Sequence, residues 1–75
     1  MRLSNVKKDK DYKVVKILLD GKLSRRLADI GLYEGCNIRL IRKSISNQTY
    51  LFEIVNIAVA IRRTIVDNII VKEDD

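Results

Sequence analysis

The sequence contains no histidine, no proline and no tryptophan, and its only cysteine is Cys36. Without an imidazole, the chain cannot form a Ser–His or Cys–His nucleophile pair, and it lacks the most common acid, base and metal ligand. A lone cysteine cannot build a thiolate metal site with a second cysteine or close an internal disulfide, which fits a reducing compartment such as the cytoplasm. These absences argue against an enzyme, a dedicated metal site and a bound cofactor.

Long hydrophobic runs are missing as well. The apolar runs of the 75-residue chain are only a few residues long, well short of a membrane span of about 20 residues. The first residues, MRLSNVKKDKDYK, are too polar for a signal peptide. We therefore expect one cytoplasmic domain over residues 1–75, without direct membrane insertion, and a core built from the 47% of hydrophobic residues.

The net charge of +5 is unevenly distributed along the chain. Residues 1–43 hold twelve Lys and Arg against five Asp and Glu, whereas residues 44–75 hold three against five. A basic half can attract nucleic acid, anionic lipid or an acidic protein surface. Nucleic-acid surfaces usually add stacking aromatics, but Tyr50 and Phe52 alternate in a strand pattern and are expected in the core. Only Tyr33 is expected at the surface, where one ring offers little area for stacking on bases. A small nucleic-acid-binding barrel is therefore kept as the alternative hypothesis.

Five segments carry the β-branched or alternating pattern that is typical of strands. They are residues 12–19, 36–43, 50–55, 57–61 and 69–72. In the first, Val14 and Val15 are adjacent and break the alternation, which predicts a bulge. The polar stretch of residues 44–49 is expected to be a hairpin loop, and Asn56 is expected to be a turn residue.

A short helix is expected after the first strand. Leu23, Leu27 and Ile30 follow one another at i, i+4 and i+7, which places them on one helix face that we expect in the core. Asp20 can cap the start of this helix. Gly31 fits the position just past its end, where a positive φ is needed.

The remaining turn and capping residues complete the fold prediction. Gly35 is expected in a second turn, directly before Cys36, whose strand position predicts a buried structural thiol. Thr64 and Asp67 resemble the capping pattern of a single helical turn. The sequence therefore predicts a mainly β domain: a small, partly closed barrel of about five strands, with one short helix after the first strand and one helical turn before the last.

The stretch LSRRLADIGLYEGCNIRLIRK, residues 23–43, resembles the hallmark of the ferrous iron transport protein A (FeoA) family. The family pattern is a leucine, an arginine pair, an apolar helix, a Gly-Leu turn, a second glycine and a strand. The opening MRLSNVKKDKDYKVVKI and the closing IAVAIRRTIVDNIIV are similar to the family as well, so the resemblance covers nearly the whole chain. The chain departs from the family pattern near Lys8 and Asp9, where Pro-Gly is common, and at Asn56, where glycine is common.

This resemblance implies an SH3-like barrel and a cytoplasmic accessory role in ferrous iron transport. The implied partner is FeoB, a membrane ferrous-iron transporter with a nucleotide-hydrolysing domain. The same fold occurs as the C-terminal domain of iron-dependent repressors, so a stand-alone relative of that domain stays open as an alternative. A weak homo-oligomer also stays open.

Four residues of the helix and its turn are candidates for contacting the partner. They are Arg25, Arg26, Leu32 and Tyr33. Arg25 can pair with Asp29 at i+4. Arg26 is then a solvated charge, a structural hydrogen-bond donor to the barrel, or a contact to an acidic partner. Leu32 and Tyr33 are expected to be the exposed apolar residues beside the arginines. The sequence predicts no metal-binding residue, so ferrous iron should bind the isolated domain weakly or not at all.

Overall fold

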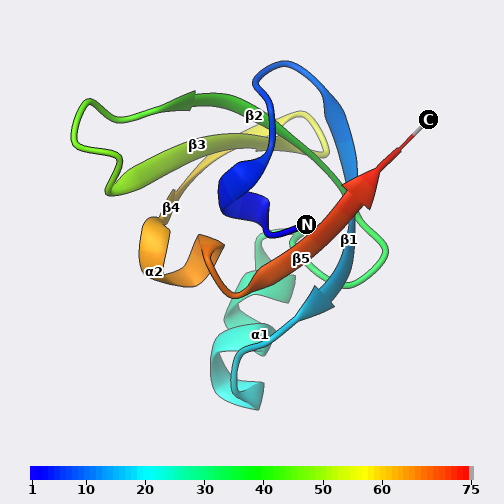
Figure 1. The fold of residues 1–75 in the computed structure, drawn as a ribbon. Helices are drawn as coiled ribbons and strands as arrows, with labels where there is room; N and C mark the ends of the chain where they lie inside the picture. Colours follow the sequence, from blue (N-terminus) through cyan, green and yellow to red (C-terminus); the bar gives the residue numbers. More distant parts are fainter. Residues whose placement is uncertain (75) are drawn as a thin grey trace.

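The computed structural model describes residues 1–74, in which five strands form one antiparallel sheet of order β4-β3-β2-β1-β5. Figure 1 shows that the sheet curls around a central core, with α1 at one end of it and α2 following β4. The strands are β1 (Asp11–Ile17), β2 (Asn37–Lys43), β3 (Thr49–Ile54), β4 (Ile57–Arg62) and β5 (Ile69–Glu73). The helices are the 3-10 turn η1 (Leu3–Asn5), α1 (Gly21–Asp29) and α2 (Arg63–Val66). None of the helices within residues 1–74 is long and apolar enough to cross a membrane.

The five predicted strands are confirmed. Alternate residues of β1, β2, β3 and β5 enter the core, whereas in β4 only Ile61 is fully buried. Tyr50, Phe52 and Ile54 of β3 are 3%, 0% and 1% exposed, which confirms that these aromatics are core residues. The predicted bulge is present, since the pairing of β1 with β5 shifts register between Val14 and Lys16. The core also draws residues from η1, α2 and the loops: Leu3, Val6, Leu32, Cys36 and Val66.

The start of α1 confirms the predicted cap. The carboxylate of Asp20 accepts a hydrogen bond from the backbone N–H of Leu23 at 2.8 Å, which satisfies one of the free donors at the helix start. The end confirms the predicted glycine, because Gly31 has φ of +94°. There Gly31 N–H donates to Ala28 O and Leu32 N–H donates to Leu27 O, which is the Schellman arrangement.

The predicted core face of α1 is wrong in one member. Leu27 is 6% exposed and Leu23 is half-buried, but Ile30 is 41% exposed. The helix ends at Asp29, and Ile30 has φ −99° and ψ 9°, so its side chain no longer follows the helical phase. The backbone reversal at Gly31 places Leu32 in the core instead, at 0% exposure.

The helical turn before the last strand is confirmed, but the predicted cap is not. Arg62 occupies the N-cap of α2 and makes no side-chain capping bond. Thr64 therefore lies inside the turn, where its carbonyl accepts a bond from the Asn68 side chain at 2.8 Å. Asp67 lies 3.7 Å from the guanidinium of Arg63.

Candidate functional site

The two arginines of α1 are both exposed to solvent. Arg25 Nε donates to the carbonyl of Gly21 at 3.3 Å. The expected ion pair between Arg25 and Asp29 is absent from the described residues, because this bond turns the guanidinium toward the helix start. Arg26 forms no ion pair within residues 1–74 and lies one turn before the exposed Ile30, so its charge is available at the surface.

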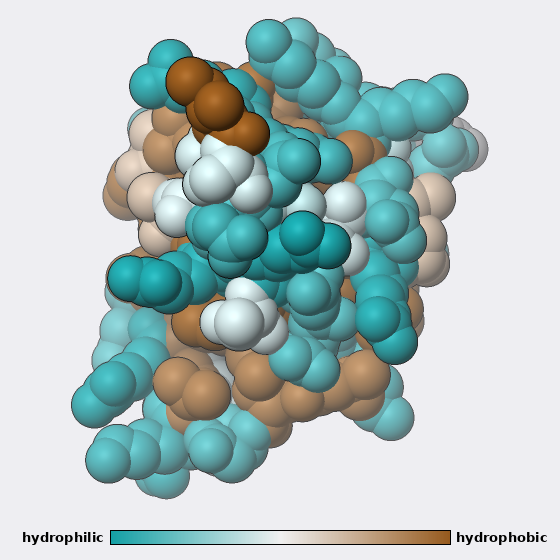
Figure 2. All heavy atoms as spheres, turned by 60° about the vertical axis from the view of Figure 1, so that its left-hand side comes forward, coloured by the Kyte–Doolittle hydropathy of each residue, from teal (hydrophilic) through white to brown (hydrophobic). Residues whose placement is uncertain are grey.

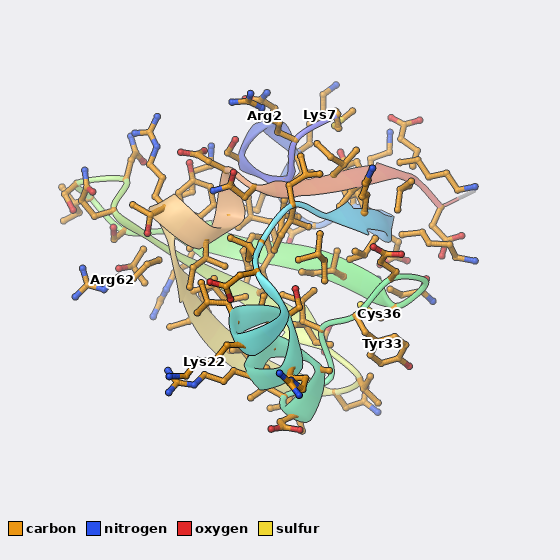
Figure 3. The ribbon with its side chains drawn as sticks, turned by 90° about the horizontal axis from the view of Figure 1, so that it is seen from below. Arg2, Lys7, Lys22, Tyr33, Cys36 and Arg62 are labelled. Atoms are coloured by element: carbon orange, nitrogen blue, oxygen red, sulfur yellow. The ribbon has the colours of Figure 1, made fainter. Side chains whose placement is uncertain are left out.

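The two apolar candidates differ in their exposure. Leu32 is fully buried, so the expectation that it is an exposed apolar residue is wrong, because the Schellman turn folds its side chain back onto the core. Tyr33 is 51% exposed, as expected. Figure 3 shows Tyr33 at the rim of the molecule, on the side of α1 and away from Arg2 and Lys7.

The structure brings a second exposed segment next to the end of α1. A Cβ placed on Gly31 would lie 3.3 Å from Cγ2 of Ile54, so the turn after the helix packs against the end of β3. Ile54 pairs directly with Ile57, and paired residues of antiparallel strands point to the same face. Ile57 is 60% exposed and Val55 is 70% exposed.

Exposed apolar residues therefore gather around the end of α1. We call this area the α1–turn surface and define it by Arg26, Ile30, Tyr33, Val55 and Ile57. Figure 2 shows hydrophobic residues at the lower end of the molecule, the end at which α1 lies in Figure 1. Sequence analysis found Arg26 and Tyr33 but missed the other three, because their exposure depends on where α1 ends and on how the β3–β4 turn lies.

The β3–β4 turn has an unusual backbone. Val55 and Asn56 connect the paired residues Ile54 and Ile57, and their φ values are +49° and +66°. A two-residue turn with two positive φ values matches the twist of a hairpin and suits Asn or Gly. Asn56 is confirmed as a turn residue, whereas Val55 is β-branched and strained in this conformation. Strain of this kind is often retained at functional positions.

Gly35 and Cys36 have structural roles. Gly35 is confirmed as a turn residue with φ of +98°, and its N–H donates to Val14 O at 2.8 Å, which ties the turn to β1. Cys36 is 4% exposed, as expected for a structural thiol, and Tyr33 N–H donates to its Sγ at 3.5 Å. Burial raises the pKa of the Cys36 thiol, so the thiolate that a nucleophile requires is disfavoured.

The carboxylates near β1 are engaged in exposed ion pairs. Arg39 Nε donates to Asp11 at 2.8 Å, and this hydrogen bond lowers the pKa of Asp11. Lys10 donates to Glu73 at 2.6 Å and lowers the pKa of Glu73 in the same way. A hollow of about 140 Å³ beside the Asp11–Arg39 pair is lined mainly by polar side chains. Within residues 1–74, no three His, Cys, Asp or Glu side chains lie close enough together to hold a metal ion.

Comparison with known proteins gives a family match. Residues 1–73 match the model of the FeoA domain. A protein of Helicobacter pylori (strain J99) named Fe(2+) transport protein A is 34% identical over 74 residues, which cover 97% of this chain and 95% of that protein.

Solved structures show the same fold. A FeoA protein from Chlorobium tepidum superposes with a TM-score of 0.90 at 23% identity, over 97% of this chain and 70% of that chain. Stenotrophomonas maltophilia FeoA, a procaryotic SH3 domain protein solved with zinc, gives a TM-score of 0.75 at 22% identity, over 96% and 89% of the two chains. The predicted SH3-like barrel is therefore confirmed. Structures of the manganese-activated repressor ScaR and the manganese regulator SloR, at 22% and 15% identity, share the fold alone.

Proposed function

Because the chain belongs to the FeoA family, we propose that it is an accessory protein of ferrous iron transport that binds the membrane transporter FeoB from the cytoplasmic side. FeoA is a family of transport accessory proteins and not of enzymes. The chain carries out no chemical step in this proposal; it acts by occupying a surface of the transporter.

The α1–turn surface is the observation that carries the proposal. Small soluble domains usually expose single hydrophobic residues, whereas a group of them beside charged residues marks an interaction site. Here Ile30, Tyr33, Val55 and Ile57 are each between 41% and 70% exposed, on segments that pack against each other. Arg26 is the charged residue beside them, so the expected counterpart on the transporter is an apolar depression with a carboxylate at its rim.

The residues of this surface divide the work of binding between them. An exposed tyrosine near the centre of a contact buries a large area at a small entropic cost, and it is a common hot spot. A charge at the rim adds less affinity but speeds association. Arg26 and Arg25 are therefore expected to steer the encounter, and Tyr33 is expected to hold the complex.

The nucleic-acid alternative receives less support from the arrangement of aromatic residues. Tyr12, Tyr50 and Phe52 are 1%, 3% and 0% exposed, which leaves Tyr33 as the exposed aromatic of the described chain. A single ring offers little stacking surface. Binding to nucleic acid by charge alone should disappear near physiological salt, because few phosphates would be neutralised.

Binding of detergent-solubilised FeoB to the purified domain tests the proposal. Tyr33→Ala should shorten the lifetime of the complex at all salt concentrations, and Arg26→Glu should slow association most strongly at low salt. Ile45→Ala is the matched apolar control, because Ile45 is fully exposed in the β2–β3 loop. Lys7→Glu is the matched charge control, since Lys7 lies on the opposite side from Tyr33 in Figure 3.

Both functional variants should keep the melting temperature of the parent domain, because both side chains are exposed. The measurement is made with and without nucleotide, since the nucleotide state of the transporter can control binding. If Tyr33→Ala and Arg26→Glu bind FeoB as the controls do, the transporter is contacted elsewhere. Tight, sequence-dependent binding to DNA or RNA at physiological salt would favour the nucleic-acid alternative instead.

A further inference from the structure

The two edges of the sheet are treated differently. Beyond β5, the start of the chain covers the edge: the N-terminal ammonium donates to Val71 O at 2.9 Å, and Val71 N–H donates to Met1 O at 2.8 Å. Beyond β4, within residues 1–74, no segment forms a ladder. An uncovered edge is a place where another extended chain can add as a strand.

The open groups of β4 follow from its pairing with β3. Ile54 pairs with Ile57 across the two-residue turn, and Arg63 N–H bonds to Gln48 O at the other end. Hydrogen-bonded pairs alternate along an antiparallel ladder, so Val59 and Ile61 bond to β3. The backbone groups of Ala58 and Ala60 and the N–H of Arg62 then point outward, whereas the carbonyl of Arg62, the N-cap of α2, accepts the first bond of that helix. No hydrogen bond of Ala58 or Ala60 to another element occurs in the part of the chain that the structure describes.

A hollow lies beside this edge, on the outer face of the sheet. It has a volume of about 190 Å³ and is lined by Arg42, Ser44, Thr49, Leu51 and Ala60. A dry cavity of about 150 Å³ can hold a benzene ring, so the space suits one large apolar side chain. We call it the edge hollow.

The charge around the edge hollow is positive. Arg42 lines it, and the exposed Arg62 ends the open strand. Glu53, on the same outer face, lies opposite Arg39 in the register of β2 and β3. Neither Arg42 nor Arg62 forms an ion pair with a carboxylate among residues 1–74. Figure 3 shows Lys22 and Arg62 projecting on the same side of the molecule, the side along which β4 runs.

We propose that the open edge of β4 binds an extended segment of a partner protein, which adds to the sheet as a sixth strand. This segment carries a large apolar side chain that enters the edge hollow and an Asp or Glu beside it that meets Arg42 or Arg62. Main-chain hydrogen bonds to Ala58, Ala60 and the N–H of Arg62 supply affinity, and the two side-chain positions supply selectivity.

A second copy of this chain fits the edge poorly. In antiparallel pairing of two β4 strands, the side chains next to the edge hollow would be Ala58, Ala60 and Arg62 of the partner copy. Alanine is too small to fill the hollow, and β4 contains no carboxylate to meet the arginines. A partner with alternating apolar and acidic residues satisfies both requirements.

Titration with synthetic ten-residue peptides, followed by amide signals of the full chain, tests the proposal. The probe alternates Val and Leu with Glu, and the matched control peptide replaces Glu by Lys. The Glu peptide should shift the amide signals of Ala58, Ala60 and Arg62 and slow their hydrogen exchange. The double variant Arg42→Glu/Arg62→Glu should bind it at least about tenfold more weakly and should prefer the Lys peptide.

Ala60→Pro tests the backbone component. The N–H of Ala60 points to solvent, so proline removes the outward donor without breaking the β3–β4 ladder, and binding of the Glu peptide should be lost. The control Arg26→Glu, on the α1–turn surface, should bind the peptide normally. If Ala60→Pro does not fold, the double charge variant carries the test alone. Equal binding of both peptides, shifts confined to α1, or concentration-dependent self-association through β4 would each overturn the proposal. Because the readout does not involve FeoB, it is independent of the proposed function.

Discussion

The strained turn residue Val55 offers the sharpest test of the structure. Val55 has φ of +49° and is 70% exposed. Replacing it by Asn keeps the side-chain size roughly constant and introduces the residue type that this turn favours. We expect Val55→Asn to stabilise the folded domain, which is an uncommon outcome for a change of an apolar residue to a polar one.

The size of the effect follows from two opposing contributions. A left-handed conformation costs an ordinary residue about 1–2 kcal/mol, and a β-branched one lies toward the upper end. Full burial of a valine stabilises by about 1.5–3 kcal/mol, and less than a third of that is at stake for a side chain that is mostly exposed. The free energy of unfolding should therefore rise by about 1 kcal/mol, or about 4–8 °C in melting temperature for a domain of this size.

Urea and thermal denaturation measure the change, and Val55→Thr is the matched control. Threonine is polar, like asparagine, but keeps the β-branch of valine, so Val55→Thr should leave the free energy of unfolding nearly unchanged. If Val55→Thr stabilises as much as Val55→Asn, the gain comes from reduced surface hydrophobicity and not from released strain. A destabilised Val55→Asn would show that the backbone of the turn is not strained.

Three further predictions concern glycine, the core and pH. Gly31→Ala should cost more stability than Gly35→Ala in urea denaturation. Both glycines have φ near +95°, but only at Gly31 does the new Cβ meet another residue, at 3.3 Å. Equal losses would show that backbone strain alone matters. Leu32→Ala should cost about 2–5 kcal/mol, as for a buried leucine, and a mild loss would place Leu32 at the surface after all. The pKa values of Asp11 and Glu73 are lowered in the folded state, so on acidification the unfolded chain binds protons first; the contribution of the two ion pairs to stability is present above the ordinary values of 3.8 and 4.5 and is lost as pH falls through the folded values. Because both groups are exposed, salt should reduce this loss of stability. Stability that rises on acidification in this range would contradict the pairing.

Much of the fold could be predicted because its signals are local. The Asp20 cap, the glycine after α1 and the alternation of β3 each depend on neighbours within a few residues. The bulge in β1 was visible as a break in alternation for the same reason. Even η1, which sequence analysis missed, is only three residues long, too short for any periodic pattern to mark it.

The candidate site was predicted less well because exposure is not local. Ile30 was expected in the core and Leu32 at the surface, and the structure shows the reverse. The reason is that α1 ends at Asp29, before Ile30. Ile57 shares the strand parity of Val59 and the buried Ile61, and only the position of Gly31 against Ile54 shows that Val55 and Ile57 border the helix. The edge of β4 is open because the start of the chain lies beside β5, at the other edge of the sheet, and no sequence pattern within β4 can indicate this.

The α1–turn surface and the edge hollow lie at opposite ends of one strand, which makes them separable by experiment. Ile57 begins β4 on the α1–turn surface, and Arg62 ends it beside the edge hollow. Five residue steps of about 3.3 Å separate them by roughly 17 Å, and substitutions this far apart without shared partners usually act additively. A partner that uses both surfaces should therefore lose affinity in Ile57→Ala/Arg62→Glu by the sum of the two single losses in free energy. A clear excess over that sum would mean that the strand transmits a change between its ends, and that the two surfaces form one site.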